Sequence, residues 1–141
     1  MRTARLLSFA LLTALIPLAS CTDAFGIGTR PIGTWSIEEY NGERIPALFD
    51  ANSFEYTEIV SDVFLIEANG SYSNDYTFRI TSNNRSVRLE SYSDFGYWDR
   101  NGTDYYLTDS RTGDVAAASV SGGRMVVEYR GDVYRYRRLD N

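Results

Sequence analysis

From Gly33 to the C-terminus, apolar and aromatic residues alternate with polar ones along the chain. A period of two places successive side chains on opposite faces, which is typical of a strand with one buried face. No window keeps the 3.6-residue period of an amphipathic helix, although the stretch 45–52 allows one helical turn. The alternation predicts strands over residues 33–40, 53–60, 62–68, 71–80, 85–92, 95–100, 103–109, 114–120, 124–130 and 133–139.

Short turn sequences separate these predicted strands at regular intervals. They include Asn41-Gly42, Asn69-Gly70, Asn101-Gly102 and Gly122-Gly123. Such pairs favour tight hairpins because glycine, and to a lesser degree asparagine, adopts positive φ. Parallel strands would require long crossover connections, and the chain has no room for them. The sequence therefore predicts an all-β fold, a single small antiparallel up-and-down β-barrel of about eight to ten strands.

The hairpin at Asn69-Gly70 allows two registers. A two-residue turn would place a glutamate among aromatic residues. A three-residue loop with its glycine in the left-handed bulge position instead pairs Ile66 with Tyr72 and Phe64 with Asn74. A slip of one residue turns every side chain to the other face, so burial should select the second register. That register gathers on one face Phe64, Ile66, Tyr72, Tyr76, Phe78 and Ile80.

The first 20 residues follow a different pattern, a short basic start and then an apolar run at positions 6–18. The run is too short for a permanent membrane span and has the layout of a secretory signal helix. Residues 22–32 hold glycines and a proline with little periodicity, which predicts a flexible tether. We therefore expect a signal peptide over 1–20, Cys21 and the tether over 21–32, and the barrel over 33–141.

The residues Leu18-Ala19-Ser20-Cys21 resemble the lipobox of bacterial lipoprotein precursors. In that family the cysteine thiol receives a diacylglyceryl group, the signal is cut before the cysteine, and the new amine is acylated. The resemblance implies palmitate-type chains on Cys21, and two or more such chains anchor a protein stably to a membrane. In that family, an Asp directly after the cysteine retains a lipoprotein at the inner membrane. This chain has Thr22 at that position, which favours the outer membrane. An ordinary cleaved signal with an incidental cysteine is the alternative.

The charged residues exclude several classes of function. All 14 basic residues are arginines, and 19 acids bring the net charge to −5 with no histidine. Such an acidic chain repels phosphate backbones, so we expect no nucleic-acid partner. Without histidine or lysine, the chain lacks His-assisted nucleophiles, imidazole metal ligands and Schiff-base lysines. We therefore expect no enzymatic activity, no catalytic residue, no metal and no cofactor.

Several short motifs of the predicted barrel resemble the lipocalin and calycin family. Gly33-Thr34-Trp35 opens the first predicted strand, as the Gly-x-Trp of that family does, and Arg137-Arg138 closes the last. The resemblance implies that an arginine guanidinium lies over the indole of Trp35 and plugs the closed end of the barrel. Alternation indicates that this arginine is Arg138, because it shares a face of the last predicted strand with Tyr134 and Tyr136. The alternative is that Arg138 is a solvated residue of the C-terminal tail. The chain is shorter than true lipocalins and lacks their long first loop and C-terminal helix.

Aromatic residues recur along the predicted strands as a stripe: Tyr72, Tyr76, Phe78, Trp98, Tyr105, Tyr134 and Tyr136. They either fill the interior or line a cup for a small apolar ligand, because tyrosine and tryptophan combine an apolar body with a polar tip. Small eight-stranded barrels do both. So short a chain favours a filled interior.

These features predict a non-enzymatic lipoprotein of the cell envelope, anchored through Cys21 on the periplasmic or surface side of the outer membrane. Its lipocalin-like barrel would bind a small apolar ligand or an envelope protein. The alternative is a solid-core structural or inhibitory module that contacts a partner through exposed strands or loops. An open pocket of about 300 Å³ or more separates the two.

Overall fold

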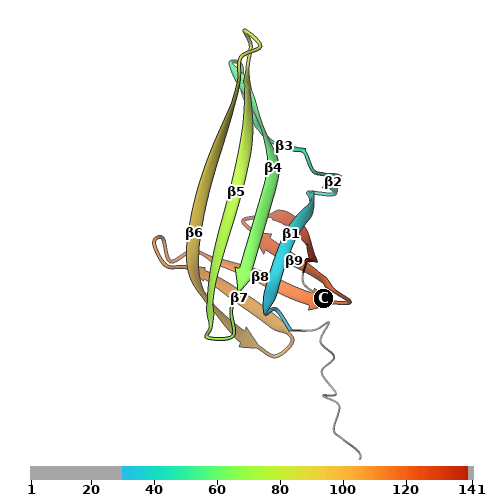
Figure 1. Cartoon of the computed structure of the whole chain (residues 1–141), viewed down its shortest axis with the longest axis vertical. Helices are drawn as coiled ribbons and strands as arrows, with labels where there is room; N and C mark the ends of the chain where they lie inside the picture. The colour runs from blue at the N-terminus through green and yellow to red at the C-terminus, as the bar shows by residue number, and fades with distance from the viewer. Residues whose placement is uncertain (1–29, 140–141) are drawn as a thin grey trace, which may run out of the picture.

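The computed structural model describes residues 30–139, and this part of the chain contains ten strands and no helix (Figure 1). It therefore holds no helix that could cross a membrane. Cys21, the predicted signal peptide and most of the predicted tether lie outside the described residues. The strands are β1 (Gly33–Tyr40), β2 (Glu43–Arg44), β3 (Ala47–Ala51), β4 (Glu55–Ile66), β5 (Ser71–Ser82), β6 (Val87–Asn101), β7 (Asp104–Asp109), β8 (Val115–Ser121), β9 (Arg124–Tyr129) and β10 (Asp132–Arg138).

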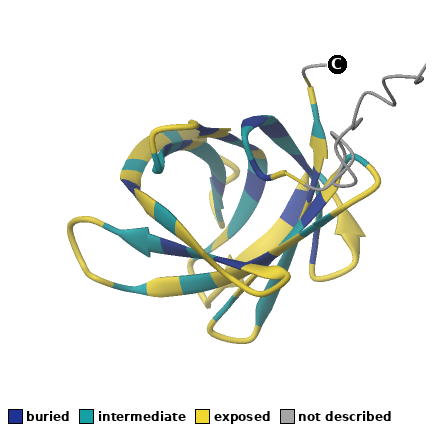
Figure 2. Cartoon of the chain, turned by 90° about the horizontal axis from the view of Figure 1, so that it is seen from below, coloured by how far each residue is buried: buried dark blue, intermediate teal, exposed yellow. Residues whose placement is uncertain are grey.

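Eight of these strands close into a barrel. From β4 to β10 each strand pairs antiparallel with the next, and β1 pairs with β10 on one side and with β4 on the other. Figure 2, viewed from below, shows the strands forming a ring around the interior. The two short strands β2 and β3 extend the edges of β1 and β4. The predicted all-β, antiparallel up-and-down barrel is confirmed, with eight strands in the ring and two outside it.

Three local predictions are wrong. The predicted strands 53–60 and 62–68 form one strand, β4, with an irregularity between Ile59 and Ser61, and 85–92 and 95–100 form one strand, β6. The backbone stays paired with β5 across both predicted breaks, and Asp62 and Asp94 are accommodated inside the barrel and at its mouth. The stretch 45–52 contains the strand β3 in place of a helical turn, because its backbone pairs with β4.

The predicted register of the first long hairpin is confirmed. Phe64 lies opposite Asn74, and Ile66 lies opposite Tyr72. Gly70 has φ 91°, a conformation that side chains with a Cβ adopt at a cost, so the bulged loop depends on this glycine. The register carries the hydrophobic face of β4 and β5 into the barrel, where Ile66 is 1% exposed.

One end of the barrel is closed by an arginine and a tryptophan. Trp35 on β1 is fully buried and lies opposite Arg138 on β10, whose guanidinium carbon is 4.3 Å from the centroid of the indole ring. Arg138 Nη1 donates to the backbone oxygen of Ile32 at 2.5 Å, and Trp35 Nε1 donates to that of Pro31 at 2.6 Å. Residues just before β1 are thereby tied across this end of the barrel.

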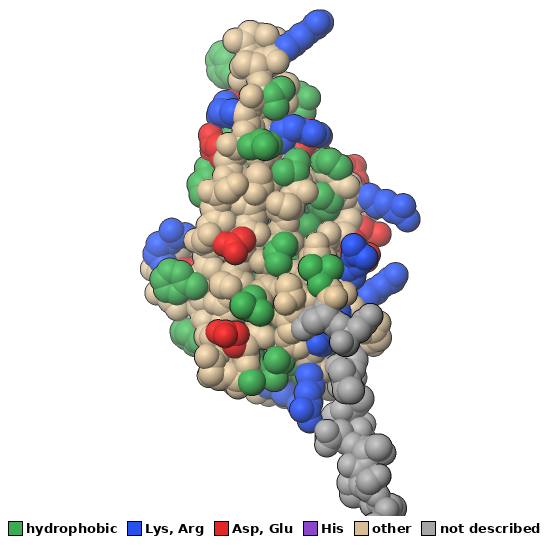
Figure 3. All heavy atoms as spheres, viewed as in Figure 1, with side chains coloured by type: hydrophobic (Ala, Val, Ile, Leu, Met, Phe, Trp, Pro, Cys, Tyr) green, Lys and Arg blue, Asp and Glu red, His purple; other side chains and the backbone are tan. Residues whose placement is uncertain are grey.

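The strands β4, β5 and β6, with 12, 12 and 15 residues, are the longest of the sheet and rise beyond the others in Figure 1. On the outward face of β6, Val87, Leu89, Phe95 and Tyr97 are all more than half exposed. Figure 3 shows hydrophobic side chains dispersed over this side of the molecule among a few charged ones.

Candidate functional site: an open aromatic cavity

The half of the barrel away from Trp35 and Arg138 contains an open cavity of about 390 Å³. The turns β7–β8 and β9–β10 lie at its end of the barrel. The expectation of a filled interior is therefore wrong for this half. Ala116 and Ala118 face inward from β8, and side chains of that size do not reach across the barrel. The cavity is lined by Phe49, Ile59, Asp62, Phe64, Tyr72, Asn74, Tyr76, Phe78, Asp94, Leu107, Asp109, Arg111, Thr112, Asp114, Ala116, Val127, Tyr129, Tyr134 and Tyr136.

Aromatic rings in mutual contact form much of the cavity wall. Phe64 on β4 meets Tyr136 on β10 edge to face, with ring centroids 5.3 Å apart. Tyr76 and Phe78 on β5 make a similar contact at 5.6 Å, and Phe49 on β3 packs on Phe78 at 4.7 Å. Such contacts hold the rings in fixed orientations and leave other parts of their surfaces available to the cavity.

Five of the seven predicted aromatic residues line this cavity, namely Tyr72, Tyr76, Phe78, Tyr134 and Tyr136. The structure does not bring Trp98 and Tyr105 there. Their rings pack edge to face at 5.9 Å, and Trp98 Nε1 donates to the backbone oxygen of Glu67 at 2.9 Å, beside the β4–β5 loop at the closed end. Alternation predicts which face a residue lies on, but its height along the barrel depends on strand register.

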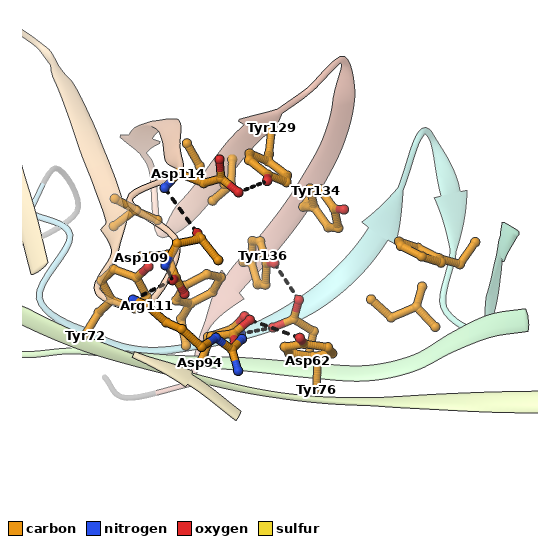
Figure 4. A pocket seen from close by; sticks show the side chains of 18 of the residues that line it. Asp62, Tyr72, Tyr76, Asp94, Asp109, Arg111, Asp114, Tyr129, Tyr134 and Tyr136 are labelled. Carbon is orange, nitrogen blue, oxygen red and sulfur yellow. Dashed lines mark hydrogen bonds and ion pairs between the residues drawn. The ribbon is translucent and has the colours of Figure 1, made fainter. Parts of the chain in front are cut away.

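A buried carboxylate lies deep in the cavity wall. Asp62 on β4 is 5% exposed, and its two oxygens accept hydrogen bonds from Tyr136 Oη at 2.8 Å and from Asn74 Nδ2 (Figure 4). Burial raises the pKa of Asp62 from 3.8 to about 6, and the negative charge of Asp94 adds to this shift, while the two hydrogen bonds lower the pKa because they favour the charged form. Among residues 30–139, Asp62 takes part in no ion pair.

The mouth of the cavity carries the other charges. Asp94 on β6 accepts hydrogen bonds from Tyr76 Oη at 3.0 Å and from Arg111 Nη2 at 2.6 Å. Figure 4 shows Asp94 next to Asp62, with Arg111 reaching Asp94 from the β7–β8 turn. Asp109 accepts the backbone N–H groups of its own turn, which lowers its pKa.

Asp114, on the far side of the mouth, is also partnered. It accepts a hydrogen bond from Tyr129 Oη at 2.7 Å, which lowers its pKa, and it forms an ion pair with Arg130 at 3.1 Å. Each carboxylate at the mouth is therefore held by an arginine or by backbone donors. Asp62 differs from all of them because its partners are neutral.

Two tyrosine hydroxyls in the cavity have no hydrogen-bond partner within the described residues. They belong to Tyr72 on β5 and Tyr134 on β10, and burial raises the pKa of both, that of Tyr72 to about 12. A phenol of raised pKa stays protonated at neutral pH and can donate one hydrogen bond to a ligand. Within residues 30–139, no three Asp, Glu, His or Cys side chains lie close enough together to hold a metal ion.

The polar lining residues Asp62, Asn74, Asp94 and Arg111 were not predicted from the sequence. A signal for the first two was present, since Asp62 shares the parity of Phe64, and Asn74 was placed opposite Phe64. Strict alternation puts both inside the barrel. Asp94 fell in the gap between the predicted strands 85–92 and 95–100, so alternation did not assign it to a face, and no sequence pattern points to Arg111.

No protein-family model matches the chain, and no curated protein matches it. Among solved structures, the chain is similar to a lipocalin-like protein from Bacteroides uniformis ATCC 8492, with a TM-score of 0.44 and 13% sequence identity. That similarity covers 77% of this chain and 97% of the other. The strand order and pairings of the chain itself define the barrel.

Proposed function

We propose that this protein is a membrane-anchored lipoprotein of the cell envelope whose barrel binds a small, largely apolar molecule without transforming it. The observation that carries the proposal is the cavity of about 390 Å³, open at one end and walled by aromatic rings. Pockets for small molecules are typically ~300–1,000 Å³, mostly apolar, with a few placed polar groups. The free hydroxyls of Tyr72 and Tyr134 are such groups.

The anchoring part of the proposal rests on the lipobox-like Leu18-Ala19-Ser20-Cys21. We expect Cys21→Ser to abolish incorporation of a palmitate analogue in metabolic labelling and to leave the signal uncut by the lipoprotein peptidase. Equal labelling of wild type and variant would contradict lipidation. Fractionation of the labelled cells would test the outer membrane as its location.

Ligand binding is tested by mass spectrometry of small molecules that co-purify with the protein from its own cells. The matched control is a pair of neighbours on β8, because Ala116 faces the cavity and Ala117 faces solvent. We expect a reproducible bound molecule in wild type and in Ala117→Phe, and its loss in Ala116→Phe, whose ring would occupy the cavity. A cavity that is empty in wild type, or a molecule retained equally by both variants, would contradict the proposal.

A protein of the envelope, the other partner predicted from the sequence, stays a prediction. The observation that favours it is the apolar outward face of β6, with Leu89 67% and Phe95 63% exposed. Site-specific photocrosslinking from Leu89 in intact cells tests it, with the outward-facing Glu128 on β9 as the matched position. The solid-core module without a cavity is not retained, because the interior is open.

A further inference from the structure

Asp62 is the one carboxylate of the cavity that is buried and lacks a positively charged partner among the described residues. Taking an ionised carboxylate out of water is costly, and neutral hydrogen-bond donors offset only part of that cost. Asn74 and Tyr136 supply one donor to each oxygen, which leaves further lone pairs on both. A cation that reached Asp62 through the cavity would recover part of the cost of burial.

The lining of the cavity as a whole is also negatively charged. It includes four aspartates, Asp62, Asp94, Asp109 and Asp114, and one arginine, Arg111, which is paired with Asp94. A ligand carboxylate placed deep in the cavity would face Asp62 and Asp94, with no uncommitted arginine in the described lining to balance it. The cavity therefore disfavours anionic ligands such as free carboxylic acids.

The walls suit a cation as well as an apolar body. Tyr76, opposite Asp62 on β5, and Tyr136, whose hydroxyl donates to Asp62, both line the cavity close to this carboxylate. The faces of aromatic rings attract cations within about 6 Å. Such a contact is stronger when water is excluded from it, and each ring also offers apolar surface to the rest of the ligand. An ammonium group beside a carboxylate and among aromatic rings is stabilised by both.

We infer that the cavity selects a cationic amphiphile, an apolar or aromatic molecule with one ammonium group that lies against Asp62. This inference rests on the proposed function and names the class of its ligand. It follows from the juxtaposition of a buried carboxylate without a cationic partner, an acidic lining and aromatic walls around one open cavity. Neutral and anionic apolar molecules of the same size are the competing ligand classes.

The experiment compares three probes that share one aromatic body: 1-naphthylmethylamine, 1-naphthalenemethanol and 1-naphthoate. Binding to the full-length protein in nanodiscs of zwitterionic lipid is measured by isothermal titration calorimetry at a pH of about 7.5, where the amine and Asp62 are both charged. Empty nanodiscs provide the blank. The variants are Asp62→Asn, which keeps the shape and removes the charge, and Asp75→Asn, a matched change on the exposed outward face of β5.

We expect the amine to bind at least about tenfold more tightly than the alcohol, and the carboxylate to bind most weakly. Asp62→Asn should bring the amine to the affinity of the alcohol and leave the alcohol unchanged, while Asp75→Asn should behave as wild type. Equal affinities for amine and alcohol, or the tightest binding for the carboxylate, would overturn the inference and leave the proposed function standing. Binding of none of the three would count against both.

Discussion

The two halves of the barrel use the same strands in opposite ways. In the closed half, the rings of Trp35, Trp98 and Tyr105 are packed and Arg138 covers the end, with backbone oxygens accepting its hydrogen bonds. In the open half, the inward positions hold tyrosines, alanines and aspartates around a cavity. Inward-facing residues thus serve stability at one end and leave space and polar groups at the other.

The two halves differ in how far partners within the fold compensate the burial of a charged side chain. The face of the Arg138 guanidinium lies on an indole and both of its terminal nitrogens donate to backbone oxygens, so most of its burial is compensated within the fold, although its buried Nε has no partner among the described residues. The carboxylate of Asp62 receives two neutral donors and a raised pKa, so part of its cost remains. Groups left with such a cost next to a cavity are typical of binding sites. The following variants test this contrast.

The largest effect is expected at the closed end. Arg138→Ala removes the contact with Trp35, the hydrogen bonds of the guanidinium and the aliphatic stem over the indole, and should lower the free energy of unfolding by about 3–4 kcal/mol. Arg137→Ala is the matched control, because Arg137 points outward and forms only a loose ion pair with Glu38 at 3.6 Å. Its effect should stay within about 0.5 kcal/mol.

Chemical denaturation measures both variants, and tryptophan emission reports on Trp35. The emission should shift to the red in Arg138→Ala alone, over a constant contribution from Trp98. A larger loss in Arg137→Ala would mean that the parity of β10 is inverted. No loss in either variant would mean that the closed half does not depend on this contact.

The next effect concerns the open half and depends on pH. The folded-state pKa of Asp62 is raised from 3.8 to about 6, so the native state binds more protons than the unfolded state between these values. The contribution of Asp62 to stability therefore falls as pH rises through this window and stays low above it. Relative to wild type, Asp62→Asn should gain about 2–3 kcal/mol between about pH 4 and about pH 8.

Unfolding of both proteins across that pH range gives the measurement as a difference. Carboxylates with lowered pKa values, such as Asp109 and Asp114, titrate in both proteins, so their contributions to the free energy of unfolding cancel in the difference. Asp94, Tyr76 and Tyr136, which face Asp62 from β6, β5 and β10, are also common to both. A difference that is constant with pH would show that Asp62 does not bear the burial cost described above.

A smaller effect separates two tyrosines of the same strand. Tyr136→Phe removes a hydrogen bond to the buried carboxylate of Asp62 and should cost about 1.5–2 kcal/mol. Tyr134→Phe removes a hydroxyl without a partner in the described residues and should change stability by less than about 0.5 kcal/mol. Thermal or urea unfolding distinguishes them, and equal losses would mean that the hydroxyl of Tyr134 is also bonded inside the fold.

The smallest effect is expected at the loop between β4 and β5. Gly70 has φ 91°, and a Cβ there would meet only the backbone oxygen of Trp98 at 4.0 Å, so strain and not collision is the cost of substitution. Gly70→Val should lower stability by about 1 kcal/mol. Gly70→Asn should cost less, because asparagine tolerates positive φ. Urea midpoints that are the same for both variants and wild type would contradict the bulged loop.

The sequence alone determined the architecture because alternation and turn chemistry are local properties. The pairing of Ile66 with Tyr72 followed from one requirement, that a strand should not bury a glutamate on its apolar face. The position of Arg138 on the face of Trp35 followed from counting along β10. A resemblance to lipocalins supplied the expectation that these two residues meet across the closed end.

Only the tertiary structure decided the character of the interior. Strand register sets how high each inward residue stands in the barrel, and so it separates Trp98 and Tyr105 from the cavity. The small side chains of β8 leave a space that composition does not reveal. Arg111 donates a hydrogen bond to Asp94, which lies 17 positions earlier in the chain, and Tyr136 donates one to Asp62, which lies 74 positions earlier. Contacts over such separations form only when the barrel closes, so local sequence patterns predict the barrel but not the chemistry inside it.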